Sequence, residues 1–270
     1  PQWIREIIAE TVTNDNTSFS YSPTKGLLAT REYIATERNL EGGTQISADD
    51  ILFFNGLGDA ISTVYNYLNK HARVIGPNPA YSTHSSAEAA HAGRPHITYR
   101  LDPRNNWYPD MDDLRRQIAH NPDIAGVLLV NPDNPTGMVY TQDIISEVVQ
   151  IVKENDLFII SDEIYYKLLY DGHQHISIAT LPGMRERTII ANGLSKTYAM
   201  TGWRLGFALA PKPIMSQMVK VQSHTISCAA AFAQHAGAAA LNGSQDCVRE
   251  MVEVYAQRRR LIVDGLNSLP

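Results

Sequence analysis

The 270-residue chain contains few cysteines, no long apolar run and no excess of positive charge. Its two cysteines, Cys228 and Cys247, have no CxxC or metal-ligand spacing, and this scarcity favours a reducing compartment. No apolar run approaches the ~20 residues that cross a membrane. The formal net charge is −5 without a basic stripe, and the nine histidines form no metal-binding pattern. These absences predict a cytoplasmic protein that binds neither membranes nor nucleic acid and holds no metal.

Apolar runs typical of strands alternate along the chain with stretches of helical periodicity. The run 126–130 is apolar on both faces, as in buried parallel strands. The alternation predicts an α/β domain with a mostly parallel, mixed sheet and helices on both faces. The expected strands are 51–54, 73–76, 96–99, 124–130, 157–161, 188–191 and 205–210, and the expected helices are 1–13, 26–39, 58 to about 70, 81–91, 110–120, 141–155, 213–224, 229–242 and 244–267.

Candidate functional residues follow the expected strands, where open α/β sheets bind ligands. The loop Gly56–Ala60 opens a helix, a position where backbone amides bind anions, although a tight turn also explains its glycines. A proline-rich turn carries a free amide at Asn134. Asp162 ends another apolar strand, where a carboxylate is usually a helix N-cap. Tyr81 opens a helix and is by itself a packing residue; His84, three positions on, is a weaker candidate for lining a pocket.

The most informative stretch is Ser195–Gly206. Lys196 follows a small hydroxyl residue next to a strand, and Arg204 stands eight positions later between glycines. A lysine amine forms a Schiff base with an aldehyde, and an arginine at a fixed distance binds a phosphate. Pyridoxal phosphate (PLP) needs both groups.

This stretch closely resembles the lysine signature of the class I and II aminotransferases, PLP enzymes of the aspartate aminotransferase fold (fold type I). Asn134-Pro135-Thr136-Gly137 matches the family letter for letter, and Asn192–Lys196 is most similar to its bacterial aspartate aminotransferase branch. The resemblance implies that the chain is the large, PLP-binding domain of such an enzyme.

The resemblance also implies roles around the cofactor ring. Lys196 would carry PLP and move a proton during the reaction. Asp162 would keep the pyridine nitrogen protonated, and Tyr165 and Asn134 would hydrogen-bond the phenolic oxygen. Tyr81 would stack on the ring.

The resemblance also implies which residues contact the phosphate. Arg204 would bind it with its planar guanidinium group. The side chain of Asp59 is expected to point away from the phosphate or to cap the helix. Where many relatives have a serine three positions before the lysine, this chain has Gly193. The remaining phosphate contacts would come from the main-chain amides of Leu57, Gly58 and Asp59 and from Ser195.

Tyr21 and the segment around it resemble the part of the family that crosses a dimer interface. The tyrosine would touch the phosphate in the neighbouring subunit, which implies a homodimer with shared sites. From the sequence alone, Tyr21 is only a loop aromatic.

Two departures from the family affect the expected boundaries and substrate. The family's chains continue into a small C-terminal domain that carries the arginine for the substrate α-carboxylate. We therefore expect a truncated chain, with the large domain in residues 1–243 and a helix leading out of it in 244–270. Some relatives of the aspartate branch carry a lysine at the position of Gly58, so aspartate is a less favoured substrate here.

We expect a transaminase that moves an amino group from an amino acid to a 2-oxo acid, with donor and acceptor left open. Alternatives on the same scaffold are a C–S lyase or an aminocyclopropane-carboxylate synthase, because substrate orientation rather than the cofactor site sets the reaction. A PLP-sensing transcriptional regulator with an aminotransferase-like domain is a further alternative.

Overall fold

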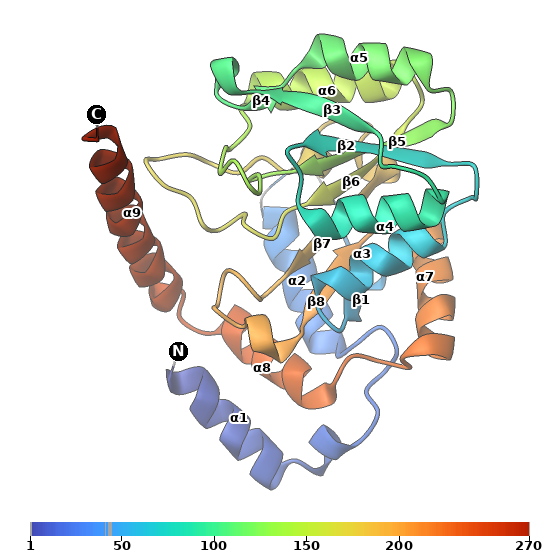
Figure 1. The fold of residues 1–270 in the computed structure, drawn as a ribbon. Coiled ribbons are helices and arrows are strands. Elements are labelled where there is room, and N and C mark those ends of the chain that lie inside the picture. Colours follow the sequence, from blue (N-terminus) through green and yellow to red (C-terminus); the bar gives the residue numbers. More distant parts are fainter. Residues whose placement is uncertain (1, 41, 43–44, 270) are drawn as a thin grey trace.

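A single mixed sheet forms the centre of the computed structural model, which describes residues 2–40, 42 and 45–269 (Figure 1). In this part of the chain the sheet has eight strands in the order β1-β8-β7-β6-β5-β2-β3-β4. Neighbours from β3 to β7 pair in parallel, whereas β8 is antiparallel to both β7 and β1, and β4 to β3. The strands are β1 (Ile51–Phe54), β2 (Arg73–Asn78), β3 (Thr98–Asp102), β4 (Tyr108–Pro109), β5 (Ile124–Val130), β6 (Phe158–Asp162), β7 (Thr188–Gly193) and β8 (Gly206–Leu209).

The expected helices and strands are present with small shifts at their ends. The helix after Gly58 ends at Asn66 rather than near residue 70, and β4 was not expected. Pro1, residues 41 and 43–44, and Pro270 lie outside the described residues. The helices are α1 (Gln2–Asn14), α2 (Leu28–Leu40), α3 (Leu57–Asn66), α4 (Ser82–Ala92), α5 (Met111–His120), α6 (Gln142–Glu154), α7 (Lys212–Thr225), α8 (Ala231–Asn242) and α9 (Asp246–Asn267).

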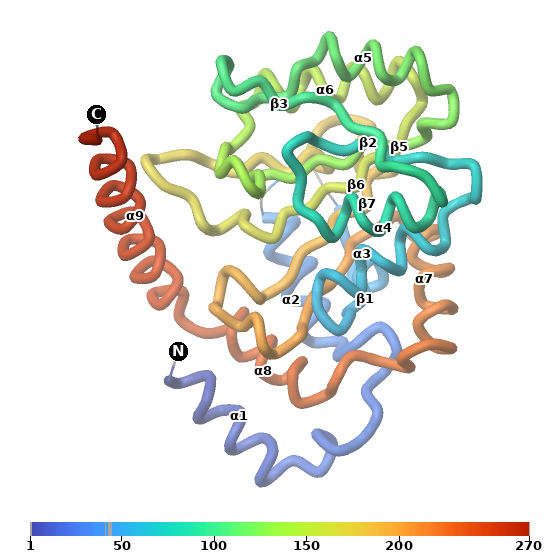
Figure 2. Tube along the Cα trace, viewed as in Figure 1, coloured from blue at the N-terminus to red at the C-terminus, as the bar shows by residue number. Residues whose placement is uncertain are grey.

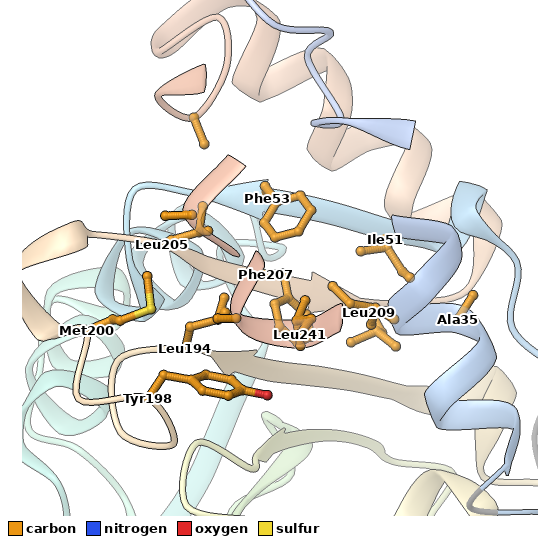
Figure 3. Packing of buried hydrophobic residues seen from close by; sticks show 14 of the residues in the cluster. Ala35, Ile51, Phe53, Leu194, Tyr198, Met200, Leu205, Phe207, Leu209 and Leu241 are labelled. Atoms are coloured by element: carbon orange, nitrogen blue, oxygen red, sulfur yellow. The ribbon is translucent and has the colours of Figure 1, made fainter. Parts of the chain in front are cut away.

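Helices cover both faces of the sheet, as the apolar strands require. Leu52 of β1 packs in a cluster with α3 and α7, whereas Ile51 and Phe53 face the cluster that includes α2 and α8. Farther along the sheet, this second face is covered by α5 and α6. Figure 3 shows Phe53 and Phe207 in the second cluster, where their rings meet edge to face at 5.8 Å. The fold class expected from the sequence is therefore confirmed.

The last helix, α9, projects from the rest of the chain (Figure 2). Val248 near its start is buried, but Leu261, Ile262 and Leu266 are exposed. The side chain of Arg259 pairs with Asp171 in the loop after β6. Among the described residues, no helix combines the length and the apolar character needed to cross a membrane.

Three glycines allow β7, β8 and the start of α3 to come into close contact. A Cβ atom on Gly206 would lie 2.7 Å from both the carbonyl carbon of Gly56 and the amide nitrogen of Leu57. A Cβ atom on Gly193 would lie 3.0 Å from the Cα of Gly206. Because the obstructing atoms belong to the backbone, any side chain at Gly206 must displace the start of α3.

We expect Gly206→Ala to lower the free energy of unfolding by about 1–3 kcal/mol, because the added methyl group overpacks a rigid backbone contact. The measurement is urea unfolding followed by circular dichroism. The control is Gly202→Ala, which meets no atom within 4 Å and should change the stability by less than about 0.5 kcal/mol. Equal unfolding midpoints for both variants would contradict the close contact.

Candidate functional site

A cleft of about 150 Å³ lies where β5, β6 and β7 end and α3 begins. Parallel strands point their carboxyl ends to the same edge, so the loops that follow them converge there. Nine of the eleven site residues expected from the sequence line this cleft, and Asp59 and Tyr21 do not. The lining consists of Leu57, Gly58, Tyr81, Val130, Asn134, Asp162, Ile164, Tyr165, Ser195, Lys196, Thr201 and Arg204.

One end of the cleft is suited to an anion. Gly56 caps α3 with a φ of 91° and supplies no side-chain hydrogen bond to the helix amides. The guanidinium group of Arg204 lies against Gly56, since a Cβ there would be 2.8 Å from its Cζ. Arg204 Nη1 donates to the carbonyl of Thr201 at 3.0 Å. Uncapped helix amides next to a guanidinium group form a typical anion site.

Asp59 lies beside this anion end but turns away from it. Its carboxylate accepts a hydrogen bond from the amide of Asn55 at 3.1 Å and so closes the turn before α3. Because Asn55 precedes the N-cap residue Gly56, this contact does not cap an amide of α3.

The lining of the cleft also includes the buried carboxylate of Asp162 at the end of β6. Its Oδ1 accepts from the amide of Ile164 at 3.1 Å, and its Oδ2 lies 3.0 Å from Nε2 of His84. These two contacts fix both carboxylate oxygens.

His84 lies behind Asp162 rather than in the lining of the cleft. It is buried on α4, and its ring meets that of Tyr81 edge to face at 6.2 Å. The three-residue spacing of Tyr81 and His84 places both rings on one face of the helix. This spacing is why the sequence marked His84 as a candidate for lining a pocket. The contact with Asp162 was not expected.

Lys196, Tyr165 and Asn134 line the same cleft and lie close to one another. Lys196 Nζ lies 5.8 Å from the ring centre of Tyr165, and Asn134 Nδ2 lies 3.5 Å from the Tyr165 hydroxyl. Burial and the nearby Asp162 carboxylate raise the pKa of Tyr165 above its ordinary value. Tyr165 therefore remains a neutral hydroxyl at neutral pH. Among the described residues, no group accepts a hydrogen bond from the Lys196 amine or forms an ion pair with it.

The cleft adjoins a larger hollow of about 530 Å³. Asn134, Tyr165 and Lys196 line both spaces. The far wall of the hollow includes Tyr170 and, from α9, Tyr255. A substrate reaching Lys196 has room on this side.

Tyr21 lies elsewhere on the surface. It is 87% exposed and lines a different hollow together with Asn55 and Phe232. In its own chain, therefore, it does not contact the cleft.

Glu163 follows Asp162 but faces a separate buried cluster. Its carboxylate pairs with Arg38 of α2 at 3.0 Å and accepts from the Ser177 hydroxyl at 2.6 Å. Burial opposes the ionised form, but Arg38, His175 and Ser177 outweigh it and lower the pKa of Glu163 to about 2. The cluster ties the segment after β6 to α2.

The comparisons with known proteins show that the chain belongs to the class I and II aminotransferases, whose family model matches residues 1–269. An uncharacterised aminotransferase of Methanocaldococcus jannaschii is 53% identical over 208 residues, which are 77% of this chain and 48% of that protein. An aspartate aminotransferase of Pyrococcus abyssi is 35% identical over 275 residues, covering 100% of this chain and 69% of the relative.

The solved structures agree with this assignment. An aromatic aminotransferase from Pyrococcus horikoshii superposes with a TM-score of 0.92 at 35% identity, covering 99% of this chain and 71% of that one. The family expected from the motifs is thus confirmed. The chain spans about half of the length of the first of these relatives and about seven tenths of the others.

The Glu163 cluster predicts a defined pH dependence of stability. Its folded pKa is depressed, so its stabilising contribution is complete above the ordinary glutamate value of 4.5 and is lost as the pH falls toward 2. Glu163→Gln should lower the free energy of unfolding at pH 7 by about 3 kcal/mol, because it removes one charge of the buried ion pair with Arg38. This difference between wild type and variant should shrink as the pH falls below 4.5.

Urea unfolding of both proteins at several pH values between 2 and 7 measures the effect. Glu10→Gln, an exposed substitution on α1, is the control and should leave the pH profile unchanged. A wild-type advantage that is constant over the whole pH range would show that Glu163 does not titrate as described.

Proposed function

We propose that this chain is the cofactor-binding part of a PLP-dependent transaminase, which moves an amino group between an amino acid and a 2-oxo acid. The proposal rests on one observation: Lys196, the anion site at Arg204 and the buried carboxylate of Asp162 line one cleft. A lysine amine suits the aldehyde of PLP, a cation suits its phosphate and a carboxylate suits its ring nitrogen. Residues 1–243 belong to the large domain in this proposal, and 244–270, which include α9, lead toward a small domain.

The anion end fits the phosphate of PLP. Arg204 has no carboxylate partner among the described residues, and its one hydrogen bond, to the Thr201 carbonyl, leaves donors on the guanidinium group available. The first amides of α3 are likewise uncapped by a side chain. A phosphate dianion satisfies both. We assign its remaining contacts to the main-chain amides of Leu57, Gly58 and Asp59 and to the hydroxyl of Ser195.

The ring end fits the pyridine part of the cofactor. Bound PLP supplies a ring that accepts electrons from the substrate. Asp162, held in place by His84, stabilises the protonated ring nitrogen. Tyr165 and Asn134 would hold the phenolic oxygen, and Tyr81, which is partly exposed, would pack against the ring.

Lys196 has two tasks in this mechanism. Its amine would hold the cofactor by the aldehyde. The same amine would serve as the base that moves a proton at the substrate Cα. The larger hollow next to Lys196 leaves space for the substrate side chain.

The charges in the lining of the cleft indicate which amino acid is the donor. Lys196 and Arg204 are the two cations of the described lining, and the mechanism uses both. Gly58 adds no third cation at the phosphate loop. We therefore infer that aspartate is a less favoured donor, although the relatives include enzymes named for aspartate as well as for aromatic amino acids.

We further infer a homodimer in which Tyr21 reaches the phosphate of the neighbouring subunit. Tyr21 and Phe19 are highly exposed, and the hollow beside them shares Asn55 and Phe232 with a second hollow that ends at Arg204. An exposed aromatic face that continues to the anion site is suited to a second copy of the chain.

The cysteines support the cytoplasmic location inferred from the sequence. Cys228 and Cys247 are both free thiols. Fractionation of the source cells tests this location, and recovery in a secreted fraction would contradict it.

Borohydride trapping tests the cofactor site. After incubation with PLP and borohydride, mass spectrometry should find a pyridoxyl group on the peptide containing Lys196. Lys196→Ala should lose this label, whereas Lys212→Ala, an exposed lysine on α7, should keep it. Arg204→Gln should weaken PLP binding by about tenfold to a hundredfold, because charged hydrogen bonds are lost, but should leave binding of pyridoxal without phosphate unchanged. Labelling spread evenly over surface lysines would reject the site.

Amino-group transfer is measured separately with a ¹⁵N-labelled amino acid. Label should enter a new amino acid only when a 2-oxo acid acceptor is present. Release of labelled ammonia without an acceptor would instead indicate a lyase on the same scaffold.

The shared site is tested by mixing subunits. Lys196→Ala lacks the amine, and Tyr21→Ala should bind PLP about tenfold more weakly because one hydrogen bond to a charged group is lost. A mixed dimer rebuilds one complete site from the two variants, so the mixed dimer isolated after coexpression should have wild-type PLP affinity at one of its two sites. Affinity no better than that of Tyr21→Ala alone, or a monomer in sedimentation velocity, would contradict the arrangement.

A further inference from the structure

A second cavity, of about 500 Å³, lies between α3 and α7. Its volume falls within the ~300–1,000 Å³ typical of small-molecule sites. It shares no lining residue with the cleft. The lining consists of Thr63, Val64, Tyr67, Leu68, Asn69, Phe158, Ile189, Ile214, Gln217, Met218, Lys220 and Val221.

Two apolar helix faces form the walls of this cavity. On α7, Ile214, Met218 and Val221 are spaced four and three residues apart and therefore lie on one face. On α3 the short side chains of Thr63 and Val64 stand opposite and leave the space unfilled. The two helices contact each other beside the cavity (Figure 1).

The floor of the cavity is rigid. It is formed by Phe158 and Ile189 at the amino-terminal ends of β6 and β7. The ring of Phe158 rests on Gly126 of β5, which has no side chain to displace it. A flat apolar surface on a strand floor favours an aromatic ligand.

The charge at the rim sets the polarity of the ligand. Lys220 is exposed there, and within the described chain its ammonium group has neither a hydrogen-bond partner nor an ion-pair partner. The described lining contains no acidic residue, and Asn69 and Gln217 add amide groups at the rim. We propose that this cavity binds an apolar, aromatic small molecule that carries one carboxylate or sulfonate, with the anion at Lys220.

The position of the cavity separates it from the cofactor. The first turn of α3 lines the cleft with Leu57 and Gly58, and the far half of the same helix lines the cavity. The cleft lies at the carboxyl ends of the strands and the cavity at their amino-terminal ends, so the two sites can be filled together.

Titration with anilinonaphthalene sulfonate, a fluorescent aromatic monoanion, tests the site. Wild type should bind one molecule per chain, and saturating PLP should not displace it. Val221→Trp fills the cavity with an indole ring and should abolish binding. Lys220→Glu should weaken binding by about fivefold through loss of the ion pair, while binding of the uncharged N-phenylnaphthylamine stays unchanged.

Two controls distinguish this cavity from other apolar surfaces. Lys212→Glu makes the same charge change at the other end of the exposed face of α7, and Leu261→Glu alters the exposed apolar face of α9. Both should bind the probe as wild type does. Displacement by PLP, loss of binding in Leu261→Glu, or unchanged binding in both Val221→Trp and Lys220→Glu would overturn the proposal. Borohydride trapping at Lys196 measures the cofactor site alone. Its failure would therefore leave the proposal for this cavity intact, and failure of probe binding would leave the cofactor site intact.

Discussion

The parallel register of β5, β6 and β7 is the constraint on which the candidate site depends. Val130 pairs with Asp162, and Asp162 pairs with Ala191, so the loops after β5 and β6 leave the sheet at the same level and the loop after β7 leaves two residues later. A shift of one residue in β6 would turn Asp162 to the opposite face of the sheet, away from His84. The buried apolar residues of the same strands resist such a shift, because it would exchange the two packed faces. The packing of the core thus fixes the position of Asp162 in the cleft.

Asp162 and Glu163 are adjacent in the chain, but the sheet directs one to the cleft and the other to a buried ion pair. Asp162 faces the side of α3 and α4 and contacts His84, while Glu163 faces α2 and pairs with Arg38. Each buried carboxylate has its own partner, which is the condition for burying charge at tolerable cost. Arg204, one of the two cations of the described cleft lining, hydrogen-bonds neither acid and remains available for an anion.

The helix α3 connects the two proposed ligand sites. Its amino-terminal end is pressed against β8 by the contact between Gly206 and Gly56, which keeps its first amides at the cleft. Its far half carries the short side chains that leave the second cavity open. The same helix therefore provides a polar end for a phosphate and an apolar flank for an aromatic ring. Both properties follow from one ten-residue segment.

The sequence by itself determined most of the elements, the family and the residues that line the cleft. Long apolar runs such as 124–130 and the loops that follow them are local signals, and Lys196 and Asn134 stand in motifs that resemble a known family. The two-residue strand β4 is too short to produce a period, so only its pairing with β3 reveals it. The pairs His84–Asp162 and Arg38–Glu163, the close contact at Gly206 and the cavity beside α7 were decided by the tertiary structure. Their partners lie far apart in the chain, and no local pattern of residues records which distant surfaces will meet.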